Sequence, residues 1–303
     1  MRDPDLQGII AASLTPVTET FEVDAGRLSG HVARLIGQGC SFVSTFGTTG
    51  EGASFSVAQK LDALEKLVAA GIAPGKLMPG VMSPTVDEAA AMLAGLDRLG
   101  CRAVVMLPPF YYGASEEGIA AFYDAALARA GTAGPPIVLY NIPQLSRVTF
   151  TPSLIERLVK KHGSRIAGLK DSTGNRDNAV MLAKTFPDLA IFVGDDRVLP
   201  DLLDAGGAGL IGGLPNLFAP SSVAYYAAPR GDGAARLVEQ TAERIRLVVE
   251  YGDLIALKGA LAHYLGDPEW RRSMPPLMPL PTERVAAFAE AIAATGYAYE
   301  AAA

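Results

Sequence analysis

The stretch PIVLYNIPQLSRVTFTPSLIERLVKKHGSRIAGLK at residues 136–170 joins two short apolar runs through a segment of helical composition. The runs at 136–142 and 166–170 lack the alternation of polar and apolar residues that marks a half-exposed strand, so each predicts a strand buried on both faces. Between them, the Thr-Pro pair at 151–152 supplies a helix cap followed by proline at the first helical position, and we expect a helix to residue 161. The stretch therefore predicts a strand–helix–strand unit of a parallel sheet.

The same alternation recurs along most of the chain. Eight apolar runs start about 20 to 37 residues apart, which fits a strand plus a crossover helix. The predicted strands are 8–17, 40–46, 77–82, 103–108, 136–142, 166–170, 190–194 and 209–214. Residues 57–70 and 87–99, which separate some of the runs, have the periodicity of amphipathic helices. From about residue 217 to 298 we expect helices only, interrupted by the Pro-rich segment 274–281.

Eight strand–helix units in series are best closed as an α/β (βα)8 TIM barrel, with additional C-terminal helices after the eighth strand. The alternative is a doubly wound open sheet. Such a sheet would carry a phosphate-binding glycine turn after its first strand, and LTPV at residues 14–17 contains no glycine. We divide the chain into a catalytic barrel over residues 1–225 and a C-terminal helical extension over 226–303. In this fold the active site lies at the carboxyl ends of the strands.

Composition narrows the class of protein. Half of the 303 residues are hydrophobic, 19% are charged, and the formal net charge is −6. These values exclude a disordered chain, and without a basic stripe we expect neither nucleic acid nor a membrane as partner. No apolar stretch reaches about 18 residues and the N-terminus lacks a signal-peptide core, so we expect a cytoplasmic protein. Two cysteines and three scattered histidines predict neither a disulfide framework nor a metal site.

Lys170 stands out among the lysines because it ends a predicted buried strand. The lysines of the predicted helices have polar neighbours: Lys60, Lys66, Lys160, Lys161, Lys184 and Lys258. At the carboxyl end of a barrel strand, a side chain points into the mouth of the barrel. An amine that is desolvated in such a place has a lowered pKa and can attack a carbonyl. The alternative is a structural ion pair between Lys170 and Asp171 or Asp196.

Tyr140 and the loop at residues 47–51 lie at the ends of two further predicted strands. A phenol at the position of Tyr140 can transfer protons during imine formation, although it can equally be a core tyrosine bonded to a backbone carbonyl. The loop reads GTTGE, whose glycines allow a tight turn with exposed N–H groups. The hydroxyls of Thr48 and Thr49 can complete a carboxylate site there. Three such features at three strand ends together predict an active site.

Four motifs resemble those of the dihydrodipicolinate synthase / N-acetylneuraminate lyase family. They are GTTGE at 47–51, YNIP at 140–143, GLKDS at 168–172 and GDD at 194–196, in the order and at the spacing of the family. The resemblance extends from about residue 7 to the RSMPPLMPL segment at 272–280. It implies a class I aldolase on a (βα)8 barrel, which forms a Schiff base with pyruvate and requires no cofactor and no metal.

The resemblance also implies roles for individual residues. Lys170 would form the imine with the keto carbon of pyruvate, Tyr140 would be the general acid and base, and Thr48 would be its hydrogen-bonding relay partner. Thr49 and the N–H groups of the loop that begins at Gly47 would hold the carboxylate of the substrate.

Oligomerisation follows from the same resemblance. Tyr111, in PPFYY at residues 108–112, is similar to the tyrosine that reaches into the site of a neighbouring subunit in this family. We therefore expect a homo-oligomer, commonly a tetramer built as a dimer of dimers. The remaining expected substrate-binding residues are Gly194, Ile211, Arg147 and Asp196.

Departures from the family patterns bear on the second substrate. Dihydrodipicolinate synthases carry an Arg two residues after the YN-x-P motif, where this chain has Leu145, and Arg147 follows two residues later. An absent Arg would remove a charge-assisted contact worth about 1.5–3 kcal/mol to an anionic aldehyde. YNIPQLS is more similar to the lyase pattern, yet Asp196-Arg197 replaces the Asp-Glu pair that N-acetylneuraminate lyases use for sugar hydroxyls.

Two further features favour a longer polyhydroxy substrate. PPFYY is similar to members that act on 2-keto-3-deoxy sugar acids, and Gly212-Gly213 leaves space after the eighth strand, unless the space is used for close packing. Arg147 and Arg197 could then serve a distal carboxylate or hydroxyls. Residues 52–60 contain no histidine, unlike the corresponding helix of lysine-inhibited members, so we expect no tight lysine site.

We therefore expect a lyase that joins or cleaves pyruvate and a small aldehyde, with a 2-keto-3-deoxy sugar acid aldolase as the leading hypothesis. One alternative is 4-hydroxy-tetrahydrodipicolinate synthase, which condenses pyruvate with aspartate semialdehyde. Another is a dehydratase that removes water from a keto-deoxy sugar acid without breaking its carbon chain. A non-catalytic metabolite-binding scaffold is the last, although binding alone does not require an amine directed at a ketone.

Overall fold

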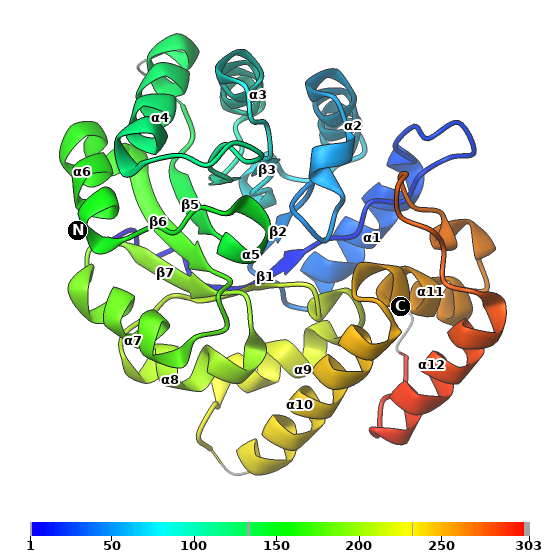
Figure 1. Ribbon diagram of the computed structural model, residues 1–303. Helices are drawn as coiled ribbons and strands as arrows, with labels where there is room; N and C mark the ends of the chain where they lie inside the picture. Colours follow the sequence, from blue (N-terminus) through cyan, green and yellow to red (C-terminus); the bar gives the residue numbers. More distant parts are fainter. Residues whose placement is uncertain (1, 132–133, 232, 300–303) are drawn as a thin grey trace.

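The computed structural model describes residues 2–131, 134–231 and 233–299, and its centre is a sheet of eight parallel strands surrounded by helices (Figure 1). The strands are β1 (Gly8–Ala12), β2 (Phe42–Ser44), β3 (Gly80–Val81), β4 (Val104–Met106), β5 (Ile137–Asn141), β6 (Ile166–Asp171), β7 (Ala190–Val193) and β8 (Gly209–Gly212). Their order in the sheet is β2-β1-β8-β7-β6-β5-β4-β3, so neighbours in space are neighbours in sequence except at β1 and β8. That order is the strand order of a barrel opened between β2 and β3.

Backbone hydrogen bonds bring the two end strands together. The Met78 amide donates to the Val43 carbonyl over 2.9 Å, and the Gly80 amide donates to the Thr45 carbonyl over 2.7 Å. Val43 and Leu77 also form a parallel bridge. The sheet thus closes on itself, and the predicted (βα)8 barrel with additional C-terminal helices is confirmed.

Helices follow the strands and cover the outside of the barrel (Figure 1). They are α1 (Ala25–Gly37), α2 (Val57–Ala69), α3 (Val86–Leu99), α4 (Glu116–Ala130), α6 (Pro152–His162), α7 (Arg176–Thr185), α8 (Leu199–Asp204) and α9 (Pro215–Ala227), with the short α5 (Pro143–Ser146) after β5. The Thr151 side chain accepts a hydrogen bond from the Leu154 amide, and Pro152 occupies the first turn of α6. The predicted start of this helix is therefore correct.

The first and third strands are shorter than predicted, and both predicted runs contain a proline. The first predicted strand runs to residue 17, but β1 ends at Ala12, and Val17 instead forms an antiparallel bridge with Val23 just after Pro16. In the third, Pro79 has no amide hydrogen, so only Gly80–Val81 pair regularly with β4. Elsewhere the strand positions agree with the prediction to within a few residues.

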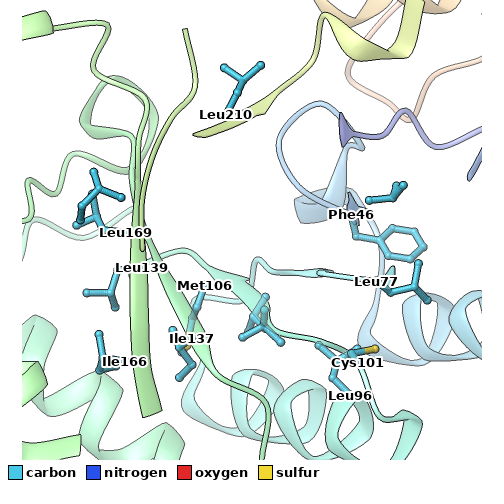
Figure 2. Close-up of a cluster of buried hydrophobic side chains, with 14 of the residues drawn as sticks. Phe46, Leu77, Leu96, Cys101, Met106, Ile137, Leu139, Ile166, Leu169 and Leu210 are labelled. Carbon is cyan, nitrogen blue, oxygen red and sulfur yellow. The ribbon is translucent and has the colours of Figure 1, made fainter. Parts of the chain in front are cut away.

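Alternate residues of each strand face opposite sides of the barrel wall. Ile137 and Leu139 of β5 and Leu169 of β6 belong to the cluster that lies between the sheet and the outer helices (Figure 2). Val138 and Tyr140, which alternate with them, belong to a separate cluster that fills the barrel interior. Because side chains alternate along a strand, the residues after Leu139 and Leu169 point inward near the carboxyl ends of their strands.

The chain after β8 is helical, as predicted, with α10 (Ala234–Tyr251), α11 (Leu254–Leu265) and α12 (Thr282–Ala294) on one side of the barrel (Figure 1). Apolar residues of these helices form one cluster with Leu14, Leu214 and Phe218 at the barrel rim. Residues 274–281 separate α11 from α12 without a helix of their own. The division of the chain into a barrel over residues 1–225 and a helical extension over residues 226–303 stays a prediction. In the described ranges, no helix is both long and apolar enough to cross a bilayer.

Candidate active site

Lys170 and Tyr140 are direct partners in the register of neighbouring strands. The pairing of β5 with β6 sets Tyr140 opposite Lys170. The Lys170 Nζ atom lies 4.2 Å from the centroid of the Tyr140 ring, and the Tyr140 hydroxyl lies 3.1 Å from Thr48 Oγ1. All three side chains line a cavity of about 620 Å³, although Lys170 and Tyr140 are only 6% and 2% exposed. An amine that is almost fully shielded from solvent, a phenol and a hydroxyl therefore lie close together at the mouth of the barrel.

The surroundings of Tyr140 favour loss of its proton. Burial raises the pKa of a phenol, but the charge of Lys170 and hydrogen bonds with Thr48, Lys170 and Ser172 outweigh that effect. The pKa of Tyr140 is consequently lowered below its ordinary value. A phenol with a lowered pKa gives up and takes back a proton more readily near neutral pH, which is what a general acid and base requires.

The cavity has a polar side and an apolar side. The polar side comes from the loops after the strands and includes Thr48, Thr49, Ser172, Thr173 and Asp196. The apolar side comes mainly from α10 and α11, through Ile245, Val248, Val249, Leu254 and Leu257. The cavity is therefore completed by helices outside the (βα)8 repeat, and its volume leaves room for a second molecule beside one the size of pyruvate.

The structure brings most of the predicted residues together. The predicted residues that line the cavity are Lys170, Tyr140, Thr48, Thr49, Gly194, Ile211 and Asp196. Gly47 lies just outside it, where its carbonyl accepts a hydrogen bond from the Gly52 amide over 2.9 Å and closes the loop. Gly194 has no space for a side chain, because a Cβ atom there would lie 2.2 Å from Ser172 Oγ.

Arg147 and Tyr111 lie outside the cavity. Arg147 ends the short α5 in the left-handed conformation, with φ of 59°, and is exposed. The turn that α5 introduces after Pro143 thus separates it from the site. Tyr111 is 80% exposed and packs edge-on against Tyr112. Because its expected position is the site of a neighbouring subunit, its role stays a prediction.

Asp171 does not form the ion pair that was the alternative role for Lys170. Its Oδ1 atom accepts from Asn141 Nδ2 over 2.9 Å, and its Oδ2 atom accepts from Asn178 Nδ2 over 2.8 Å. Thr173 contributes two more hydrogen bonds to the same carboxylate. Asp171 thereby ties the end of β6 to its loop, and within the described ranges no carboxylate forms an ion pair with Lys170.

The acidic residues after β7 have different environments. Asp195 binds Arg197, whose Nε and Nη2 atoms donate to the carboxylate over 3.0 and 2.6 Å. Asp196 is 3% exposed, and burial together with the neighbouring charge of Asp195 raises its pKa to about 7. Arg197, the arginine of the cavity lining in the described chain, is therefore paired with Asp195, while a partly protonated carboxyl group lines the cavity.

Sequence reasoning missed the buried lysines. Lys60 and Lys258 were expected among polar neighbours in their helices, but they are 1% and 0% exposed. The Lys60 ammonium donates to the Gly52 carbonyl over 3.2 Å, and burial lowers its pKa to about 8. Lys258 forms an ion pair with Glu51, and both side chains are completely buried. The helical pattern cannot reveal such partners because they come from distant segments.

The pair of Glu51 and Lys258 fastens the GTTGE loop to α11. Glu51 also accepts a hydrogen bond from the Met274 amide over 2.6 Å, and Lys258 donates to the Arg272 carbonyl over 2.7 Å. Glu51 itself adopts the left-handed conformation, with φ of 54°. The loop that contains Thr48 is thus fixed, through Glu51, to α11, the same helix that contributes Leu257 to the cavity lining.

Lys258→Met is expected to lower the free energy of unfolding by about 3–5 kcal/mol, because it leaves the buried carboxylate of Glu51 without a counterion. Urea denaturation followed by circular dichroism measures this change. The matched control is Lys66→Met, which breaks the exposed pair with Asp62 and should change the free energy by less than about 1 kcal/mol. Equal effects of the two substitutions would contradict a structural role for the buried pair.

Residues of the C-terminal helices were also missed as part of the site. Asp253, between α10 and α11, lines the cavity in a strained conformation with φ of 54° and ψ of −118°. Partial burial raises its pKa. The one sequence feature that points to this part of the site is the apolar face of α10. The sequence does not indicate what that face packs against. Ser172 could have been found, since it belongs to the GLKDS motif.

Comparisons with known proteins agree with this architecture. The model of the dihydrodipicolinate synthetase family matches residues 5–295. An uncharacterized DapA-like lyase of Chloroflexus aurantiacus is 37% identical over 285 residues, covering 93% of this chain and 94% of that protein. The N-acetylneuraminate lyase of Salmonella paratyphi B is 33% identical over 265 residues, covering 86% and 87%. The crystal structure of dihydrodipicolinate synthase from Agrobacterium tumefaciens superposes with a TM-score of 0.87 at 31% identity, covering 95% and 99%.

Proposed function

Because this chain belongs to the dihydrodipicolinate synthetase family, whose members are pyruvate-dependent lyases, we propose that Lys170 forms a Schiff base with pyruvate. We further propose that the enzyme reversibly joins this pyruvate to a neutral hydroxylated aldehyde, as a 2-keto-3-deoxy sugar acid aldolase does. The neighbouring positions of Lys170 Nζ, the Tyr140 phenol and the Thr48 hydroxyl support the first proposal. The charges around the rest of the cavity support the second.

The neutral amine of Lys170 attacks the keto carbon of pyruvate, and loss of water from the carbinolamine gives the imine. Tyr140 supplies the proton that the departing hydroxyl takes up. The Tyr140 phenolate left by this step then removes a proton from the methyl carbon, which restores the phenol and gives an enamine, whose carbon attacks the aldehyde and forms the new carbon–carbon bond. The aldehyde oxygen takes a proton from Tyr140, and water hydrolyses the imine to release the product. Cleavage follows the same steps in reverse.

The GTTGE loop is suited to the carboxylate of pyruvate. The backbone amides of Thr48 and Thr49 donate to no acceptor in the part of the chain that the structure describes. Exposed consecutive N–H groups of a turn bind anions. Thr49 also lines the cavity. We assign the carboxylate to this loop, which leaves the keto carbon of pyruvate facing Lys170.

The charges of the cavity-lining residues are the observation that favours a neutral aldehyde as the second substrate. Among the cavity-lining residues only Lys170 and Arg197 are cationic, and Arg197 is held by Asp195. Asp196 and Asp253 add two further carboxyl groups. Aspartate semialdehyde would bring a carboxylate to a region where, among the residues that the structure describes, Arg197 is already paired with Asp195. The hydroxyls of a neutral aldehyde, by contrast, can hydrogen-bond to carboxyl groups.

With pyruvate as the common donor, kcat/KM for glyceraldehyde is expected to exceed that for aspartate semialdehyde by about tenfold or more, the value of one missing charge-assisted contact. Asp195→Asn frees Arg197 and should reduce this preference by a similar factor, while Asp188→Asn, outside the cavity lining, should leave it unchanged. Initial rates with both aldehydes provide the measurement. A wild-type preference for aspartate semialdehyde would contradict the proposal in favour of the synthase. If the substrate is instead a keto-deoxy sugar acid, a product that has lost water but keeps its whole carbon chain would identify a dehydratase.

A further inference from the structure

Helix α10 separates the catalytic cavity from a second, smaller cavity. Ile245 and Val248 line the catalytic cavity, whereas Arg244 lines a cavity of about 200 Å³. The walls of this second cavity come from α9 and from the segment that follows α12, and they include Phe218 and Tyr297. None of its lining residues lines the catalytic cavity.

Arg244 is buried, and the residues that the structure describes offer it no counterion. It is 3% exposed, and its Nε atom donates to Thr295 Oγ1 over 3.2 Å. Its guanidinium carbon lies 4.5 Å from the centroid of the Phe218 ring and 5.8 Å from that of Tyr297. In the described ranges no carboxylate forms an ion pair with Arg244, so its two terminal nitrogens are left for another acceptor.

The contrast with Arg246 shows that this arrangement is specific to one face of α10. Arg246 is exposed and forms ion pairs with Glu243 over 2.7 Å and with Glu250 over 2.6 Å. A surface arginine of the same helix thus has two counterions, although its charge is already stabilised by water. The buried guanidinium of Arg244 has lost its hydration, and the aromatic faces beside it compensate only in part.

Other positive charges reinforce the field at this cavity. Arg34 is 8% exposed and donates to neutral acceptors, the Asn216 carbonyl over 2.6 Å and Gln38 Oε1 over 2.9 Å. Arg236, two turns before Arg244 on α10, also repels it. Burial is the main cause that lowers the pKa of Arg244; Tyr297 acts in the opposite direction, and the repulsion from Arg236 adds to the effect of burial. A negative charge placed in the cavity would relieve both effects.

We propose that the second cavity is a binding site for a small oxyanion, a carboxylate or a phosphate group, held by the terminal nitrogens of Arg244. A guanidinium presents parallel N–H groups that match two oxygens of such an anion. The cavity volume of about 200 Å³ accommodates a small anionic metabolite. The bound anion lies behind the apolar wall of the catalytic cavity and takes no part in the reaction proposed above.

Isothermal titration calorimetry of the full chain with inorganic phosphate, and separately with acetate, tests the site at constant ionic strength set with sodium chloride. Wild-type protein is expected to show saturable binding of at least one anion. Arg244→Gln should weaken it by about tenfold or more, the effect of a lost charge-assisted contact. Arg246→Gln is the matched control and should bind like the wild type.

Absence of saturable binding to the wild type, or equal affinity in Arg244→Gln, would overturn the proposal. If Arg244→Gln does not fold, as judged by circular dichroism, Arg244→Lys carries the test. It keeps the charge but loses the paired N–H groups, so its affinity should fall, and an unchanged affinity would count against the site. Lys170→Ala should bind the anion normally, which separates this site from the proposed function.

Discussion

Lys170→Ala is expected to lower kcat for aldol cleavage by about 10⁴-fold or more, because removal of a covalent nucleophile leaves only binding and electrostatic contributions. The amine is one of two cationic groups in the cavity lining, and the other, Arg197, cannot form an imine. Steady-state rates of pyruvate release from a 2-keto-3-deoxy sugar acid measure the loss. The folded state should survive, since Lys170 forms no ion pair within the described ranges.

Lys60→Arg is the matched control for this substitution. Lys60 is also a buried lysine, and burial lowers its pKa to about 8. Arginine keeps the charge and the contact with the Gly52 carbonyl but cannot form an imine. Its activity should stay close to that of the wild type. If Lys60→Arg were inactive and Lys170→Ala active, the nucleophile would have been assigned to the wrong lysine.

Tyr140→Phe should retain the fold and lower kcat by about 10²-fold or more, because the phenylalanine keeps the ring in the barrel interior but cannot transfer a proton. The imine should still form, although slowly. Tyr123→Phe is the matched control, since Tyr123 is fully buried and donates to the Met106 carbonyl outside the catalytic cavity. Rates of the two variants, measured with the same substrate, separate proton transfer from the loss of a buried hydroxyl.

The dependence of activity on pH distinguishes proton transfer by Tyr140 from a purely structural role. The hydrogen bond between the hydroxyls of Thr48 and Tyr140 helps to lower the pKa of Tyr140. Thr48→Val removes that bond, so the pKa of Tyr140 should rise and the ionised form should be reached only at higher pH. The activity profile is expected to shift toward higher pH accordingly. An unshifted profile would mean that Tyr140 does not titrate in the rate-determining step.

The barrel and the core of the site could be predicted from sequence because both depend on local pattern. Parallel strands buried on both faces give continuous apolar runs, and a chemically active residue that ends such a run lies at the mouth of the barrel. Lys170 and Tyr140 satisfy this rule. Their direct pairing in the register of β5 and β6 then follows from the fold. Proline also limits a strand: Pro79 has no amide hydrogen to pair, and β3 begins only at Gly80, later than predicted.

The remainder of the site depends on contacts between distant segments, which local pattern does not record. Val248 of α10 and Leu257 of α11 reach the cavity because these helices fold back over the barrel rim. Arg147 is near Tyr140 in sequence, yet the four-residue helix between them directs it to the surface. Lys258 looked like an ordinary helical lysine until Glu51, more than 200 residues earlier in the sequence, proved to be its partner.

Reduction with sodium borohydride in the presence of pyruvate tests the Schiff base most directly. Intact-mass spectrometry of the wild-type chain should show the addition of one carboxyethyl group, and peptide mapping should place it on Lys170. Lys170→Ala should gain no mass, and Lys60→Arg should be labelled like the wild type. An unlabelled wild-type protein, or a label on any other lysine, would contradict the central claim that the amine at position 170 is the nucleophile.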